Sequence, residues 1–235
     1  WLKQKILSSR PFSGKAETAS SLISKEAQPV KSNLSSDSRP VWVYVEQNEG
    51  RTANVSWELL GAGASLARKL NTALEAVVIG YQVEGAAQEA ASYGASRVYV
   101  IDKPILRHYR TAPYARALSK VAIAYQPQVL LIGATRNGRD LSGMVATTIQ
   151  TGLTADCTSL DIDPETGCLL QIRPTWGGRQ IAMIVTPPEN VFWTPPTSGT
   201  FSASMVDFEE AGELAVFIDE EQLASLEEKM NEKGY

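Results

Sequence analysis

The chain has too few histidines and cysteines for the sites that depend on them. Its 235 residues include one histidine, His108, and two cysteines, Cys157 and Cys168. A single histidine cannot supply a multi-histidine metal site, and two thiols cannot form a disulfide framework for a domain of this size. We expect both cysteines to be free thiols, with one disulfide between them as the alternative.

A basic excess and long apolar runs are also missing. Lys and Arg total 22 against 26 Asp and Glu, which gives a net charge of −4. Proteins that bind nucleic acid through its phosphates usually carry a basic excess. The apolar runs at residues 129–132 and 214–218 are far shorter than the ~20 residues that cross a bilayer. We therefore predict a soluble protein with no nucleic-acid partner and no membrane span.

The first 40 residues differ in composition from the rest of the chain. They are rich in serine and poor in large apolar residues, and their beginning is basic. This composition predicts an N-terminal extension or linker over residues 1–40. A transit-peptide remnant or an arm that docks a partner would have a similar composition.

From residue 41 onward, strand patterns alternate with helix patterns. Strands are predicted at residues 41–46, 73–80, 97–101 and 129–133. Helices are predicted between them, one beginning after Ser56 as its N-cap and the others at residues 85–93, 109–125 and 140–150. Short connections of this kind imply right-handed βαβ crossovers. The predicted fold is a parallel-sheet, three-layer α/β sandwich of Rossmann-like type.

Beyond Gly152 the pattern changes to short strands. Three are predicted, at residues 159–163, 169–173 and 181–186, as a small β addition to the sheet. Residues 190–199 contain two prolines and read as a loop. An acidic amphipathic helix is predicted at residues 220–233. We assign residues 41–205 to the α/β domain and residues 206–235 to an acidic linker and helix.

One segment, GATRNGRDL at residues 133–141, has the character of an anion-binding loop. It follows a predicted strand and opens a helix, where free N–H groups and the helix dipole favour an anion. Its glycines match neither dinucleotide nor P-loop spacing, so a structural loop capped by Asp140 is an open alternative. GxSxG and CxxC motifs are missing, and His108 has no nucleophile to serve, so no catalytic residue is predicted.

Longer motifs resemble the α subunit of electron transfer flavoproteins. They are GATRNGRDLSGMVATTIQTGLTADCTSLDID at residues 133–163 and RPTWGG at residues 173–178. VWVYVEQNEGR, ELLGAGASLA and YGASRVYVID extend the match toward the N-terminus, so that it covers about residues 41–188. The sequence departs from the family at VFWTPPTSGTFSAS, and nothing after Gly199 resembles the family's FAD-holding domain.

The resemblance implies a fold, a function and partners. The fold is of the adenine-nucleotide-hydrolase type, and a β-type subunit carrying AMP or a second FAD is the expected partner. The pair would form the base for FAD-mediated electron transfer from dehydrogenases, such as an acyl-CoA dehydrogenase, to a quinone- or ferredoxin-linked acceptor. Such a chain is an electron-transfer component rather than a stand-alone catalyst, in the cytoplasm or the mitochondrial matrix. The alternative is a non-redox scaffold or adenine-nucleotide-binding module.

The matching motifs also supply candidate binding residues. They lie at predicted strand ends and loops, where α/β folds place ligands, and we expect them to contact the flavin or the partner subunit. They are Arg136, Asn137, Gly138, Arg139, Asp140, Thr151, Gly152, Leu153, Thr154 and Arg173. The aromatic stretch at residues 191–201 and the strands at residues 159–186 are candidates for the partner surface.

The missing resemblance to the FAD-holding domain generates a prediction. The purified 235-residue chain should bind FAD weakly or not at all without a partner. Flavin absorbance after gel filtration, with the free chain and added FAD, measures this directly. Retention of one tightly held FAD per chain would contradict the prediction.

Overall fold

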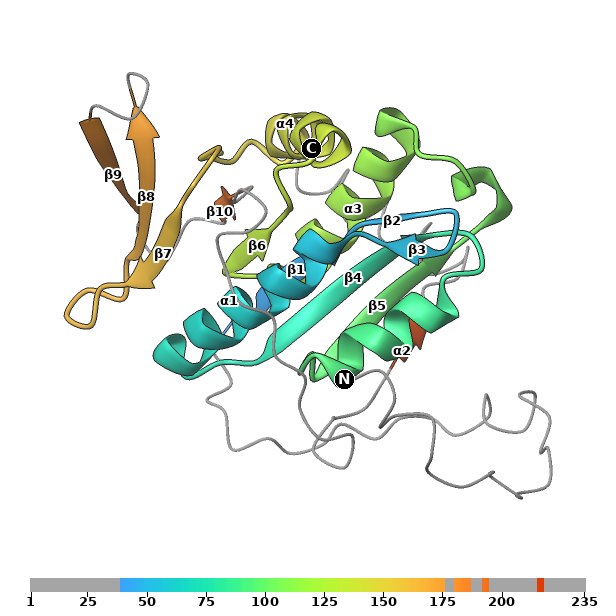
Figure 1. Ribbon diagram of the computed structural model, residues 1–235, viewed down its shortest axis with the longest axis horizontal. Coiled ribbons are helices and arrows are strands. Elements are labelled where there is room, and N and C mark those ends of the chain that lie inside the picture. Colours follow the sequence, from blue (N-terminus) through green and yellow to red (C-terminus); the bar gives the residue numbers. More distant parts are fainter. Residues whose placement is uncertain (1–38, 176–179, 187–191, 195–214, 218–235) are drawn as a thin grey trace, which may run out of the picture. The chain divides into compact units, whose positions relative to one another are not determined.

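A computed structural model describes residues 39–175, 180–186, 192–194 and 215–217, which all belong to one compact unit (Figure 1). The predictions for the N-terminal extension and for the acidic helix lie outside these residues. The helices are α1 (Asn54–Leu70), α2 (Glu84–Ser92), the 3-10 helix η4 (Pro104–Leu106), α3 (Thr111–Tyr125) and α4 (Arg136–Thr148). Within this described part of the chain, no helix has the length and apolar character needed to cross a membrane.

The main sheet is parallel and has six strands in the order β10-β6-β1-β4-β5-β11. They are β1 (Val41–Val45), β4 (Leu74–Gly80), β5 (Arg97–Asp102), β6 (Val129–Leu131), β10 (Phe192–Thr194) and β11 (Ala215–Phe217). The chain passes from β1 to β4 and β5 on one side and then crosses to β6 on the other. The point at which the winding reverses therefore lies between β1 and β6.

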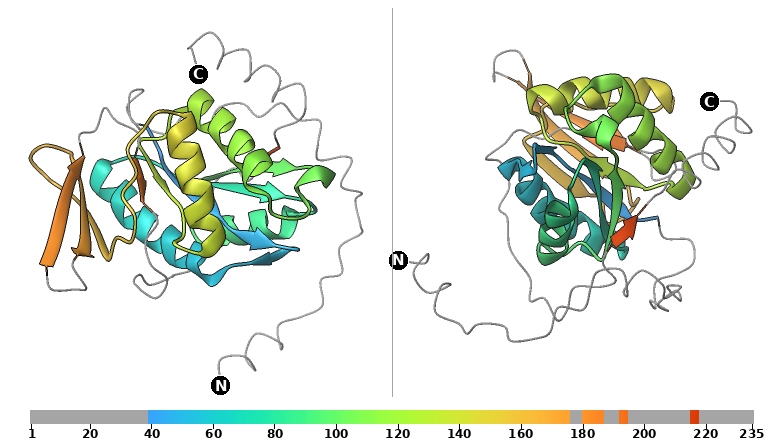
Figure 2. Two further views of the ribbon diagram at one scale, coloured as in Figure 1. Left: turned by 90° about the horizontal axis from the view of Figure 1, so that it is seen from above. Right: turned by 90° about the vertical axis from the view of Figure 1, so that its right-hand side faces the viewer.

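Burial of β1 explains why helices cover both faces of this sheet. Val41, Val43 and Val45 pack in one buried cluster with α1 and α2. Trp42 and Tyr44 point the other way and pack with α3 and α4. Figure 2 shows the two pairs of helices on opposite sides of the sheet. The predicted three-layer α/β sandwich is confirmed.

The outer strands of the main sheet differ from the prediction. Residues 192–194, inside the predicted loop, pair in parallel with β6 as strand β10. Residues 215–217, inside the predicted C-terminal linker, pair in parallel with β5 as strand β11. Sequence patterns missed both strands because each is short and pairs with a strand distant in the chain. The domain limits themselves stay a prediction.

The three predicted short strands are present, but they form a sheet of their own. β7 (Ser159–Ile162), β8 (Leu169–Thr175) and β9 (Gln180–Thr186) pair antiparallel in that order. Ile162 and Leu169 join the buried cluster of α1, and Lys69 of α1 forms an ion pair with Asp161. The predicted small β addition is therefore confirmed, and it is a separate sheet that packs beside the main one.

Two helix starts also differ from the predictions. Ser56 does not cap α1, because α1 begins at Asn54, and the Ser56 Oγ instead accepts a hydrogen bond from the Glu46 N–H at 2.9 Å. α4 begins at Arg136, four residues before the predicted start at Asp140. Thr135 is its N-cap and accepts from the Gly138 N–H at 2.9 Å. Asp140 lies inside α4 and hydrogen-bonds with Thr111, the first residue of α3.

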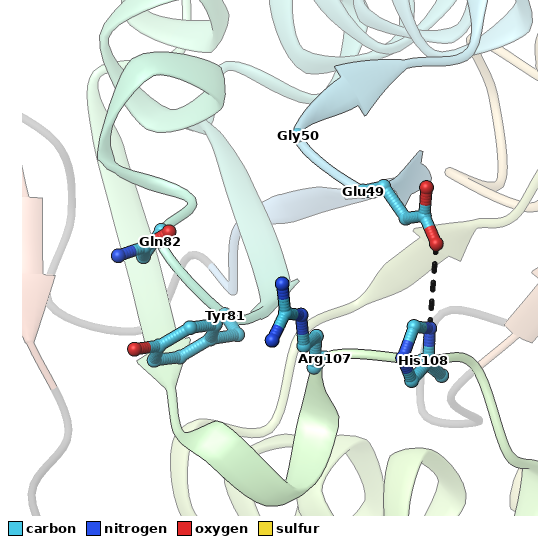
Figure 3. A pocket seen from close by; sticks show the side chains of 6 residues that line it. All are labelled: Glu49, Gly50, Tyr81, Gln82, Arg107 and His108. Carbon is cyan, nitrogen blue, oxygen red and sulfur yellow. Dashed lines mark ion pairs between the residues drawn. The ribbon is translucent and has the colours of Figure 1, made fainter.

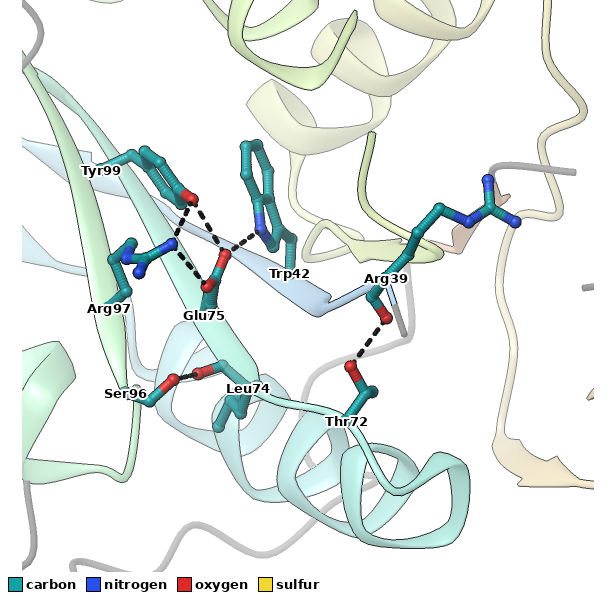
Figure 4. Close-up of polar contacts among 8 residues, drawn as sticks. All are labelled: Arg39, Trp42, Thr72, Leu74, Glu75, Ser96, Arg97 and Tyr99. Carbon is teal, nitrogen blue, oxygen red and sulfur yellow. Dashed lines mark hydrogen bonds and ion pairs between the residues drawn. The ribbon is translucent and has the colours of Figure 1, made fainter. Parts of the chain in front are cut away.

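A buried carboxylate joins three strands near their amino ends (Figure 4). Glu75 of β4 accepts from the Trp42 indole at 2.8 Å and from the Tyr99 hydroxyl at 3.1 Å. The Arg97 guanidinium lies 3.4 Å from its other oxygen. A buried carboxylate is tolerated when its charge and lone pairs are satisfied in this way. The contacts fix β1, β4 and β5 relative to one another.

Close packing explains two glycines of the segment 133–141. A Cβ on Gly138 would overlap the carbonyl oxygen of Gly133, and a Cβ on Gly133 would lie 2.7 Å from the Val55 side chain. Both glycines therefore let the end of β6 approach the first turns of α1 and α4. Gly143, farther along α4, has no atom within 4 Å of its added Cβ.

These environments predict opposite effects of alanine in the same helix. Gly138→Ala should destabilise the chain by about 1–3 kcal/mol or more, because the clash is with backbone that cannot rotate away. Gly143→Ala, the matched control, should stabilise it by roughly 0.5–1 kcal/mol through helix propensity. Urea unfolding followed by circular dichroism measures both changes. Equal stability of the two variants would contradict the close approach at Gly138.

Candidate functional site

The carboxyl ends of the parallel strands meet at one edge of the main sheet. In open α/β sheets this edge holds ligands where the winding reverses, which here is between β1 and β6. Glu46 follows β1 directly, and Thr135 is the N-cap of α4 after β6. The Thr135 hydroxyl donates to Glu46 Oε2 at 2.6 Å, so the two loops meet at this point.

Glu46 is held by both neighbouring loops. Its carboxylate also accepts from the side chain of Asn137. Its N–H donates to the Ser56 Oγ at 2.9 Å, and its C=O accepts from the Ala53 N–H at 2.8 Å. The residue therefore ties β1 to the first turns of both α1 and α4.

Burial decides the protonation of the groups around Glu46. It raises the pKa of the Glu46 carboxyl above its ordinary value, although the hydrogen bonds from Thr135 and Asn137 lower it in part. Burial also raises the pKa of the Tyr44 and Tyr109 hydroxyls, and that of Tyr114 to about 12. All three phenols are therefore neutral near pH 7, and Glu46 is the member of this cluster that titrates on the acid side.

Most of the predicted residues 136–140 gather around an open hollow of about 680 Å³. Its lining consists of Tyr109, Arg136, Asn137, Arg139 and Asp140. Arg139 is committed to its own chain, since its guanidinium lies 2.6 Å from Asp156 and donates to the Ala134 carbonyl at 3.2 Å. The Arg136 side chain is exposed. Gly138 lies buried behind this surface.

The remaining predicted residues lie elsewhere. Residues 151–154 follow the far end of α4, a 13-residue helix about 20 Å long. The chain then returns along α4, since Asp156 reaches Arg139. Arg173 lies on β8 in the small sheet, and its Nε is buried without a hydrogen-bond partner. The structure thus does not unite all ten residues in one pocket, and their contact with a flavin or a partner stays a prediction.

A second hollow of about 280 Å³ lies where β1, β4 and β5 end (Figure 3). Its lining consists of Glu49, Gly50, Tyr81, Gln82, Arg107 and His108. His108 Nδ1 lies 3.4 Å from a Glu49 oxygen, and both side chains are exposed. None of the six lining residues is a serine or cysteine nucleophile. Across the described residues, no cluster of three or more His, Cys, Asp or Glu could hold a metal ion, and both cysteines are free thiols.

A β-hairpin at this edge was missed by the sequence analysis. β2 (Gln47–Asn48) and β3 (Arg51–Thr52) pair antiparallel around Glu49 and Gly50, which have φ values of 50° and 78°. Two such residues are typical of the tightest hairpin turns, and the Asn-Glu-Gly sequence is the signal that could have revealed it. Glu46 and Thr135 were also missed as a pair, because their contact spans 89 residues of sequence.

The fold defines a parallel α/β domain of Rossmann-like type, and comparison with known proteins identifies its family. A model for the electron transfer flavoprotein domain matches residues 41–215. The chain belongs to the electron transfer flavoprotein family. The resemblance found in the sequence motifs is confirmed.

The similar proteins are alpha-type members of this family. Protein FixB of Azorhizobium caulinodans is 52% identical over 149 residues, which are 62% of this chain and 40% of that protein. Electron transfer flavoprotein subunit alpha of Thermoanaerobacterium thermosaccharolyticum is 41% identical over 181 residues, 77% of this chain and 54% of that protein. The corresponding subunit of Clostridium acetobutylicum is 45% identical over 149 residues, 63% and 44% of the two chains. The chain spans about half the length of these relatives.

The raised pKa of Glu46 predicts how one substitution changes stability with pH. A carboxyl whose folded pKa is raised binds its proton more tightly in the folded state, so wild-type stability falls as the pH rises through that range. Glu46→Gln cannot ionise. Its melting temperature should exceed that of the wild type at pH 7, and the difference should vanish below about pH 4, where both states of the wild type are protonated.

Thermal melts of the two proteins between acid and neutral pH test this, with the exposed Glu49→Gln as the matched control. The control should change the melting temperature little at any pH. A Glu46→Gln variant that melts below the wild type at pH 7 would show that the ionised carboxylate stabilises the start of α4 by more than its burial costs.

Proposed function

We propose that this chain is the alpha-type component of an electron transfer flavoprotein and forms, with a beta-type subunit, the base of an FAD-dependent electron carrier. The family match across residues 41–215 carries this proposal. The two-faced α/β domain is consistent with it, because a domain with its sheet covered on both sides is a rigid support. The relatives named subunit alpha are, by that name, parts of multi-subunit proteins.

FAD fits the described residues as a surface contact. The redox chemistry would belong to the isoalloxazine ring, with protein groups supplying position and charge. Arg136 and Asn137 offer donors beside the open hollow of 680 Å³, and an exposed guanidinium suits a pyrophosphate oxygen. Arg139 is already paired with Asp156. We infer that other parts of the complete assembly hold most of the flavin, and that AMP, where present, belongs to the beta-type partner.

The outer face of the β7-β8-β9 sheet is the proposed contact with the beta-type subunit. Ile181, Met183 and Val185 alternate along β9 and are 75%, 59% and 55% exposed. In the antiparallel register Pro174, Ile172 and Leu170 of β8 lie directly opposite them, on the same face. Six neighbouring apolar residues thus form one surface, which we call the β9 face. Such a patch marks an interaction site in a folded protein.

The composition of this face supports the choice of the beta-type subunit as its partner. β9 ends its sheet, and its sequence QIAMIVT has no charged residue and no proline. Exposed edge strands usually carry such residues to prevent pairing with other chains. An apolar, uncharged face suits the centre of a permanent subunit interface better than a transient encounter with a dehydrogenase. An acyl-CoA dehydrogenase as electron donor, and a cytoplasmic or mitochondrial location, stay predictions from the resemblance.

Substitutions on the β9 face test the assembly. Met183→Asp combined with Val185→Asp should weaken binding of the beta-type subunit by about 100-fold or more, because buried apolar anchors dominate such interfaces. Ile105→Asp is the matched control, since Ile105 is also apolar and 63% exposed but lies in η4. Gel filtration and calorimetry with the co-expressed beta-type subunit measure binding, and circular dichroism of each variant checks folding.

The assembled complex should also show flavin absorbance that bleaches when an electron donor is added. Equal binding by the double variant and the wild type would exclude the β9 face as the interface. A stable complex that never acquires flavin would contradict the proposed function while leaving the interface intact.

A further inference from the structure

The N-terminus of α4 is the anion-binding position of this edge of the sheet, and the chain fills it with a side chain of its own. We propose that Glu46 is a built-in anion that takes the place of a phosphate at the winding reversal, so that this position excludes phosphate-bearing ligands such as AMP. A helix N-terminus at a switch point is where this type of fold receives phosphate. The inference concerns the chain alone and does not rest on the proposed function.

Hydrogen bonds tie the first turn of α4 to Thr135. The Gly138 N–H donates to the Thr135 Oγ1 at 2.9 Å, and the Arg139 N–H donates to the Thr135 carbonyl at 3.0 Å. The Thr135 hydroxyl in turn donates a hydrogen bond to Glu46 Oε2 at 2.6 Å. The carboxylate thus lies one hydroxyl away from the amides that a phosphate would need. Its negative charge opposes a second anion at the same place.

Packing leaves no room for a side chain at the two glycines beside this helix start. Gly133 and Gly138 are the two glycines of the segment between the end of β6 and the first turn of α4. A Cβ on either would already meet the chain itself, at the Val55 side chain or the Gly133 carbonyl. Their missing side chains therefore serve the close contact of β6 with α1 and α4. They do not form a phosphate-binding loop.

A strand-end carboxylate also lies beside the neighbouring helix at this edge. Asp102, the last residue of β5, accepts from the Gln82 and Val83 N–H groups at 2.9 and 3.0 Å, directly before α2. Two carboxylates at strand ends therefore face two helix starts. Arg136 and Arg139 instead line the open hollow of about 680 Å³ beside the start of α4. Any anion bound there would be separate from the Gly138 amide, so the two positions can be distinguished.

Phosphate titration of the full 235-residue chain tests the role of Glu46. The backbone amide signals of Gly138 and Asn137 are followed by NMR while inorganic phosphate, and separately AMP, is added. The wild type should show no saturable shift at Gly138. Glu46→Ala should gain one, with apparent phosphate affinity raised by about tenfold or more, because the helix N-terminus attracts anions once the carboxylate is gone.

Two further variants complete the experiment. Glu46→Gln keeps the length of the side chain, so it should fold even if the alanine variant does not, and should show a smaller gain. Glu49→Ala removes an exposed carboxylate of the nearby turn and should gain nothing at Gly138. The proposal is wrong if wild-type Gly138 responds saturably, if neither Glu46 variant gains a response, or if their response is confined to the Arg136 and Arg139 guanidinium signals.

Discussion

Burial of β1 on both faces is the constraint from which the rest of the domain follows. Every residue of VWVYV is excluded from solvent, so alternate side chains must find apolar cover on opposite sides of the sheet. The valines require α1 and α2, and the aromatic residues require α3 and α4. Parallel neighbours on each side of β1 require long crossover connections. The carboxyl ends of the main-sheet strands and the helix starts that follow them therefore lie along one edge of this sheet.

That edge is where this family member differs from a nucleotide-binding domain of similar outline. Thr135 caps α4 and donates to Glu46, Asp102 accepts from the two amides directly before α2, and Gly133 and Gly138 serve internal contacts. A domain of this kind can act as a rigid support, with the surfaces proposed for flavin and partner contact farther out, at Arg136 and on the β9 face. The division of roles between a supporting domain and a separate redox cofactor is consistent with an alpha-type electron transfer flavoprotein component.

The elements with strong local patterns could be predicted from the sequence. Continuous apolar runs identify β1, β4 and β5 as buried strands. The helical spacing of Leu118 and Val121 identifies α3 and its buried side. The start of α4 could not be placed, because Thr135 and Asp140 are both good N-cap residues and Asn137 and Gly138 between them are weak helix formers. The Glu46–Thr135 contact was beyond reach for a different reason, since only the sheet order brings these residues together.

The pairing of β10 with β6 has a consequence for how the domain is made. β6 is an inner strand only after residues 192–194 have been synthesised, because β10 forms its outer neighbour. While the ribosome is still adding the small antiparallel sheet, the open side of β6 presents unpaired amides and carbonyls flanked by apolar side chains. Such an edge can pair with another nascent chain. By pairing with β6, β10 covers an edge that would otherwise be open to such contacts.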